Sequence, residues 1–266
     1  MGTEFSVLGD LQVRAGGQSV RVGHSRQACV LAALLVDLNR VVPADQLAVR
    51  AWGDQPPQRA RATLHTYLSR LRAALRPHPG VTLQRRPAGY VLGADPATVD
   101  LHRFRQLVAE ARTAPDDGTA RSMLDQALAL WRGEPFASLD TPWLAVVRTG
   151  LEAERLAVEL DRNDLRLRLG GHADLLAELT RQAATHPLDE RLAGQLILAQ
   201  YRSGRQADAL GTYEALRRRL VADLGADPGA RLRELHHAVL TNDPAVAAPC
   251  RPTLPAGGAD PAAPVA

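Results

Sequence analysis

Three residue types are rare or missing in this chain of 266 residues: it has no lysine, two cysteines and 4% aromatic residues. Without lysine, a P-loop, a Schiff-base lysine and a kinase site are all excluded. Cys29 and Cys250 lie far apart and match no disulfide framework, and Cys29 is expected to be a small core residue. With so few aromatic residues, the core must consist of leucine, alanine and valine, which favours helices.

Long apolar runs and catalytic motifs are also missing. No run approaches the ~18 residues of a membrane span, and the N-terminus has the pattern of a strand, not of a signal peptide. A location in the reducing cytosol follows as an expectation. HExxH, paired CxxC and GxSxG motifs are absent, and we expect no enzyme and no cofactor.

Adjacent histidines and scattered tryptophans have structural explanations. On a helix, His236 and His237 point about 100° apart, so we expect exposed side chains and no metal pair. The tryptophans lie in leucine- and alanine-rich surroundings and are expected to be core or interdomain anchors: Trp52, Trp131 and Trp143.

Positive charge is concentrated at the N-terminal end. Residues 1–95 hold 12 arginines and 6 acidic residues, whereas residues 96–248 hold 19 arginines and 22 acidic residues. A basic end on an otherwise balanced chain indicates nucleic-acid binding by one domain.

The stretch Arg59–Arg76 carries the strongest signal. Its leucines recur at helical spacing and form one apolar stripe: Leu64, Leu68, Leu71 and Leu75. The other side is rich in arginine, serine and threonine and contains no acidic residue. Arginine can bind guanine or phosphate, and hydroxyl groups can donate to phosphate. The pattern fits a DNA recognition helix, and a solvated basic helix is the alternative.

The order of elements in the first 95 residues favours the recognition helix. Alternating residues predict strands at 5–14 and 19–22, and a hairpin at 81–86 and 90–92. Helical spacing predicts helices over 26–39, with Ser25 as N-cap, over 45–52 and over 59–76. Three helices followed by a hairpin are typical of a winged helix-turn-helix, in which the third helix enters the major groove.

This order assigns roles to individual residues. We expect base contacts from the outward side of the third helix: Thr63, Thr66, Ser69, Arg70 and Ala73. Phosphates should be neutralised by its flanks: Arg59, Arg61, Arg72 and Arg76. The wing should add backbone or minor-groove contacts through Arg85 and Arg86. Backbone amides at a helix start can bind a further phosphate, at Ser25, Arg26 and Gln27. His65 is expected either to pack against the first helix or to touch DNA.

From Leu101 onward the sequence predicts only helices, over 101–114, 119–131, 142–170, 172–186, 188–203, 205–224 and 228–240. A weak repeat of 34 residues relates Ala173-Asp174, Leu176 and Ala177 to Ala207-Asp208, Leu210 and Gly211. This is the tetratricopeptide period and predicts a short solenoid; a generic helical bundle is the alternative. Residues 242–266 are rich in Pro, Ala and Gly and predict a disordered tail.

Several segments resemble one family closely. In the basic half these are Asn39–Leu47, Ala51–Pro57, Arg61–Arg72 and Pro87–Tyr90; in the helical half they are Leu130–Pro135, Ser203–Leu210, Tyr213 and Leu224–Pro228. They resemble the Streptomyces antibiotic regulatory proteins, which are transcriptional activators of secondary-metabolite gene clusters. The resemblance implies an OmpR-type α+β winged helix over residues 1–95 and an all-α, tetratricopeptide-like bacterial transcriptional activation domain over 96–241. The chain resembles the small two-domain form, and a truncation of a larger member at a linker is the alternative.

The resemblance also implies partners. Two copies would bind tandem direct repeats near the −35 region and recruit RNA polymerase through its sigma factor and alpha C-terminal domain. The polymerase-facing loop would be Gly53–Gln58, that is Gly53, Asp54, Gln55, Pro56, Pro57 and Gln58. Self-association on DNA and location with the nucleoid would follow. Two alternatives remain: a helical interaction module with a non-specific basic anchor, and a repressor with the same DNA-binding domain.

Overall fold

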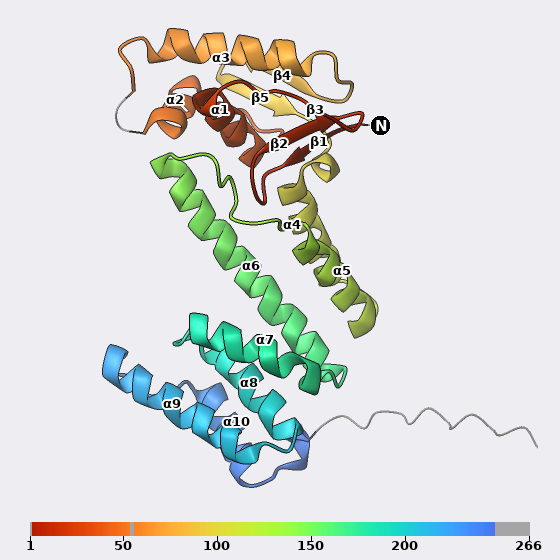
Figure 1. Ribbon diagram of the computed structural model, residues 1–266, viewed down its shortest axis with the longest axis vertical. Helices are drawn as coiled ribbons and strands as arrows, with labels where there is room; N and C mark the ends of the chain where they lie inside the picture. Colours follow the sequence, from red (N-terminus) through yellow and green to blue (C-terminus); the bar gives the residue numbers. More distant parts are fainter. Residues whose placement is uncertain (1, 54–55, 248–266) are drawn as a thin grey trace, which may run out of the picture. The chain divides into compact units, whose positions relative to one another are not determined.

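The computed structural model describes residues 2–53 and 56–247 and shows a small β-rich region followed by helices (Figure 1). The chain divides into two compact units, Met1–Arg162 and Asn163–Ala266. Within the described residues, none of the helices is long and apolar enough to cross a membrane.

The first unit begins with the antiparallel sheet β1 (Thr3–Ser6), β2 (Gln12–Ala15) and β3 (Gln18–Ser19). Opposite residues of β1 and β2 include Phe5 and Val13, both buried. The prediction of one continuous strand over 5–14 is wrong. The chain turns after β1 because the Val7 and Leu8 amides donate to the Asp100 carboxylate and not to a neighbouring strand.

The winged helix follows as α1 (Ser25–Val36), α2 (Ala44–Trp52), α3 (Ala60–Leu75), β4 (Thr82–Arg86) and β5 (Gly89–Gly93). The order agrees with the prediction, and each helix ends within three residues of its predicted bounds. Helix α1 is the centre of this core, because its residues from Gln27 to Leu35 are all buried. They include Cys29, as predicted, and burial raises the pKa of its thiol.

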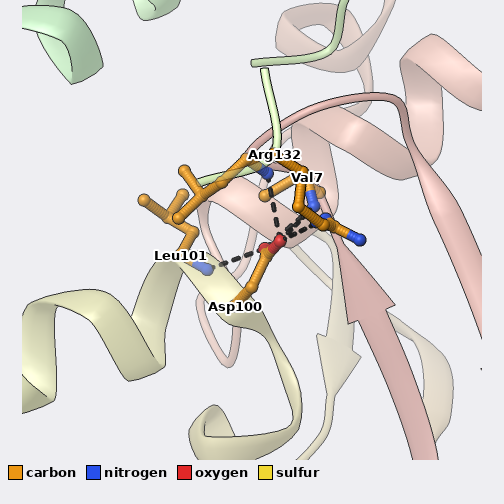
Figure 2. A network of polar contacts seen from close by, with 5 residues as sticks. Val7, Asp100, Leu101 and Arg132 are labelled. Carbon is orange, nitrogen blue, oxygen red and sulfur yellow. Dashed lines mark hydrogen bonds and ion pairs between the residues drawn. The ribbon is translucent and has the colours of Figure 1, made fainter. Parts of the chain in front are cut away.

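Asp100 connects the winged helix to the helices that follow. It lies in the first turn of α4 (Asp100–Ala111), and its carboxylate accepts hydrogen bonds from the Val7, Leu8 and Leu101 amides and from Arg132 at 2.7–3.1 Å (Figure 2). Burial raises the pKa of Asp100, and the amides and Arg132 oppose that shift. The carboxylate therefore accepts hydrogen bonds from the two amides that have no strand partner in the turn after β1.

Further contacts join the same parts of the first unit. After α5 (Asp117–Ala129), Arg132 N–H donates to Leu8 O at 2.7 Å and Phe136 N–H donates to Gly9 O at 2.7 Å. His102 Nε2 lies 2.8 Å from Leu35 O, at the end of α1. The Arg50 guanidinium of α2 lies 4.6 Å from the ring centroid of Trp143, in α6 (Pro142–Arg168). These contacts extend the first compact unit beyond residue 95.

All three tryptophans pack against neighbouring elements. Trp52 stacks on Tyr67 of α3, and Trp131 lies edge-on to Phe104 of α4 with Arg155 over its ring. Trp143 contacts Arg50, as above. None of these three rings lies on the outward face of α3, which agrees with the expected anchoring role.

The second unit contains α7 (His172–Thr185), α8 (Glu190–Arg202), α9 (Gln206–Leu224) and α10 (Ala230–Leu240) after the end of α6. Helix α8 packs between α7 and α9. The buried residues of α7 are Leu175, Leu179 and Gln182, and those of α9 include Ala209, Tyr213 and Leu216. Each of the first three precedes its counterpart by 34 residues, so the predicted repeat period is confirmed in the burial pattern.

Two details of the second unit differ from the prediction. His236 is half-buried and stacks on Tyr213 with 3.8 Å between ring centroids, so only His237 of the pair is exposed. The chain also remains folded after α10: Pro244–Val246 forms a short 3-10 helix, and Arg202 Nε donates to Val246 O at 3.1 Å. The rest of the predicted tail, residues 248–266, lies outside the described residues.

Candidate nucleic-acid interface

Helix α3 separates an apolar side from a polar side. Its four buried residues are Leu64, Leu68, Leu71 and Leu75, which form the predicted stripe and face α1, α2 and β4. Of the nine residues expected to face DNA from α3 and its two caps, Thr63 is half-buried and eight are exposed; the eight are Arg59, Arg61, Thr66, Ser69, Arg70, Arg72, Ala73 and Arg76. Leucine burial therefore fixes which side of the helix reaches solvent.

The N-terminus of α3 favours an anion. Arg59 is its N-cap residue, no side chain caps the helix, and its first turn contains no acidic residue. The helix dipole places partial positive charge at this end, next to the Arg59 and Arg61 guanidinium groups. A phosphate at this position would meet positive charge from both the backbone and the side chains.

The arginines of α3 have different partners. Arg61 binds Asp45 through two hydrogen bonds of 2.9 Å, and both side chains are more than 70% exposed. An exposed pair of this kind stabilises little and can exchange its carboxylate for a phosphate. Arg59, Arg70 and Arg76 have no acidic partner among residues 2–53 and 56–247.

Arg72 has a structural bond that the sequence did not indicate. Its Nε donates to Leu83 O at 2.8 Å and so ties the last turn of α3 to strand β4. The predicted phosphate contact of Arg72 stays a prediction, and it would involve the remaining nitrogens of the guanidinium group.

The wing is the hairpin of β4 and β5. Arg85 pairs with Tyr90 and Arg86 with Gly89 across a turn formed by Pro87 and Ala88, and both arginines are exposed. On its other side β5 bonds to Val42, since Tyr90 N–H donates to Val42 O and Val42 N–H to Tyr90 O. A Cβ at Gly89 would lie 2.1 Å from Val42 O, so this position requires glycine.

A groove of about 320 Å³ lies between α3 and the wing. Its cationic lining consists of Arg61, Arg85 and Arg86, and Asp45 is its acidic residue. His65 lies there too, and its Nδ1 is 2.7 Å from the Tyr90 hydroxyl. His65 therefore bonds to β5 rather than packing against α1. No local sequence pattern indicates this pair, because His65 and Tyr90 are 25 residues apart.

The start of α1 differs from the prediction in its side chains. His24, not Ser25, is the N-cap residue, and it makes no capping bond, so the predicted cap is wrong. The Arg26 guanidinium donates to Ala51 O at 2.9 Å, and the Gln27 side chain is buried. The first backbone bond of α1 joins Ala28 N–H to His24 O. The amides of Ser25, Arg26 and Gln27 precede that bond, and their phosphate contact stays a prediction.

The loop before α3 is exposed at Pro56, Pro57 and Gln58. Gly53 is buried, with a positive φ of 68°, and its Cβ position lies 3.3 Å from Pro142. Gly53 thus ends α2 and cannot present a side chain to a partner. Asp54 and Gln55 of the predicted polymerase-facing loop lie outside the described residues.

Comparison with known proteins identifies the family. Residues 18–92 match the family "Transcriptional regulatory protein, C terminal", and residues 99–240 match "Bacterial transcriptional activator domain". The chain is 36% identical to the regulatory protein DnrI of Streptomyces peucetius, over 91% of this chain and 94% of DnrI. The chain belongs to the Streptomyces antibiotic regulatory protein family. It is therefore a transcriptional regulator.

Longer relatives share the same two parts. The chain is 41% identical to the regulatory protein AfsR of Streptomyces coelicolor, over 91% of this chain but only 25% of AfsR. The solved structure of Mycobacterium tuberculosis EmbR with a low-affinity phosphopeptide has a TM-score of 0.86 and 34% identity, covering 91% of this chain and 66% of EmbR. This regulator of the antibiotic regulatory family therefore shares a winged helix and a helical domain with EmbR. The matched families and these relatives are named as transcriptional activators or regulators.

Proposed function

We propose that this regulator activates a secondary-metabolite gene cluster by binding tandem direct repeats near the −35 region and recruiting RNA polymerase. The exposed cationic face of α3 beside the cationic wing is the observation that supports it. Its similarity to DnrI over nearly the whole of both chains supports the antibiotic-cluster assignment.

The residue roles within this proposal follow from the contacts. Arg70 lies on the outward face of α3 without an acidic partner among the described residues, and it is the proposed base-reading arginine. The proposed phosphate contacts of the helix and its caps are Arg59, Arg61, Arg72 and Arg76, and the wing is proposed to contact the DNA backbone or minor groove through Arg85 and Arg86. Exposed Pro56, Pro57 and Gln58 are the part of the described loop available to the sigma factor or the alpha C-terminal domain.

A gel-shift assay at ~150 mM salt with excess random duplex tests the DNA contacts. Arg70→Ala should weaken binding to the operator by about 1–3 kcal/mol and relax the sequence preference. Arg76→Ala should weaken binding to all duplexes alike and lower the slope of log affinity against log salt concentration by about 1. Arg121→Ala, at an exposed position of α5, is the matched control and should bind as the wild type does. If the excess random duplex removed all of the protein from the operator, the basic N-terminal region would instead be a non-specific anchor.

Transcription with purified polymerase tests the activation step. Replacing Gln58 with alanine should reduce transcript while leaving the gel shift unchanged, because Gln58 is exposed and precedes α3. If this variant produced as much transcript as the wild-type protein, the proposed role of the loop would be contradicted. Reduced transcript upon adding the wild-type protein would indicate a repressor.

A further inference from the structure

The second unit contains a cavity of about 360 Å³ that the DNA-binding role does not use. It lies among the end of α6, helix α8 and the first turns of α10, all within residues 163–266. Its apolar wall consists of four leucines: Leu167, Leu198, Leu232 and Leu235. Pockets that bind small molecules are typically of this size, apolar, and lined by a few convergent polar groups.

The two carboxylates at this cavity, Asp164 and Glu190, already accept hydrogen bonds from the protein. Asp164 accepts hydrogen bonds from Arg191 and from Gln195, both at 2.6 Å. Glu190 accepts the Gly229 amide at 2.7 Å, at the positively polarised start of α10. These bonds hold the polar wall in place through the protein's own groups, and such preorganisation lowers the entropic cost of binding.

Arg231 is the second guanidinium of the lining, beside Arg191, which bonds to Asp164. It lies in the first turn of α10, which contains no acidic residue, and its side chain is exposed. Among the residues that the structure describes, no carboxylate pairs with it. A leucine wall next to an uncompensated guanidinium is complementary to a molecule with an apolar body and one anionic group.

We propose that this cavity binds a small apolar acid, with the hydrocarbon or aromatic part against the four leucines and the anionic group on Arg231. Gly194 of α8 sets the room available. Its Cβ position lies 3.6 Å from Leu232 and 3.7 Å from Leu235, which are ordinary contact distances. Alanine would fit there, and a longer side chain would enter the space that the ligand takes.

Two fluorescent probes test the proposal on the full chain. Anilinonaphthalene sulfonate has an apolar body and one anionic group, and N-phenylnaphthylamine has the same body without the sulfonate. The wild type should bind both, the sulfonate more tightly. Arg231→Gln should weaken the sulfonate about tenfold, the loss of one charge-assisted bond, and leave the neutral probe unchanged.

Gly194→Leu should abolish binding of both probes. Gly211→Leu is the matched control, since Gly211 also lies within a helix and no atom lies within 4 Å of its Cβ position. It should bind as the wild type does. Circular dichroism verifies that each variant is folded, and if Gly194→Leu unfolds, the Arg231→Gln comparison decides. Failure of the wild type to bind, equal binding by folded Gly194→Leu, or equal sulfonate affinity of Arg231→Gln would overturn the proposal.

Discussion

At the scale of single residues, the wing depends on one missing side chain. Gly89 has a φ of 154°, and its hydrogen faces the Val42 carbonyl, where a Cβ would lie at 2.1 Å. The close approach permits the two backbone bonds between Val42 and Tyr90. The wing is therefore held against the turn before α2 by a contact that no other residue type permits.

Gly89→Ala should destabilise the fold by about 2–4 kcal/mol, because the methyl group must displace backbone atoms. Its affinity for DNA should fall as well, since Arg85 and Arg86 move with the hairpin. Gly80→Ala is the control, because Gly80 also has a positive φ but has no atom within 4 Å of its Cβ position. Urea unfolding measures both variants, and equal losses would show that the contact with Val42 is unimportant.

His102 is a second residue with a measurable consequence. Burial lowers the pKa of His102 below its ordinary value of 6.5, and Nε2 lies 2.8 Å from Leu35 O. The unfolded chain therefore takes up a proton at a higher pH than the folded chain does. This contribution to the free energy of unfolding is present above pH 6.5 and is lost as the pH falls through the lowered pKa.

His102→Gln removes the titrating group and keeps a donor for Leu35 O. The melting temperature of the wild type should fall further than that of the variant between about pH 7.5 and about pH 5.5. Near pH 8 the two proteins should melt within a few degrees of each other, which serves as the internal control. Parallel curves across this range would contradict the assignment.

At the scale of elements, the first turn of α4 joins the turn after β1 to the segment after α5 through one carboxylate. Asp100 satisfies three amides and Arg132, and its own side chain is 9% exposed. Removal of the carboxylate leaves buried donors without an acceptor, which is costlier than the loss of an exposed bond.

Asp100→Ala should therefore lower the free energy of unfolding by about 3 kcal/mol. Asp95→Ala is the matched control: Asp95 also accepts a backbone amide, from Ala97, but at an exposed position, and its loss should be smaller. Chemical denaturation compares the two. A loss no larger in Asp100→Ala than in Asp95→Ala would show that the joint contributes little.

At the scale of the whole molecule, the sequence suggested a division at residue 95, and the compact unit extends to Arg162. The family matches also separate between residues 92 and 99. The difference arises from contacts that cross this position: Asp100 to Val7, His102 to Leu35 and Trp143 to Arg50. Family modules and compact structural units need not share their bounds.

A fragment of residues 1–95 should consequently melt at a lower temperature than a fragment of residues 1–162. The shorter one removes the backbone bridge of Phe5 to Val99 and leaves the Val7 and Leu8 amides without Asp100. Circular dichroism melting measures this. Equal melting temperatures would show that the winged helix is energetically independent of α4–α6.

The sequence determined the order and nature of nearly every element, because leucine spacing fixes the buried face of a helix wherever the helix packs. It placed the stripe of α3 and hence its cationic face, and the motif resemblance supplied the family. Local patterns cannot report which distant groups meet. The turn after β1, the bond of Arg72 to Leu83, the pair of His65 and Tyr90 and the stack of His236 on Tyr213 all depend on residues brought together only by folding. The tertiary structure alone decided which arginines remain without an acidic partner among the described residues, since pairing is a property of neighbours in space.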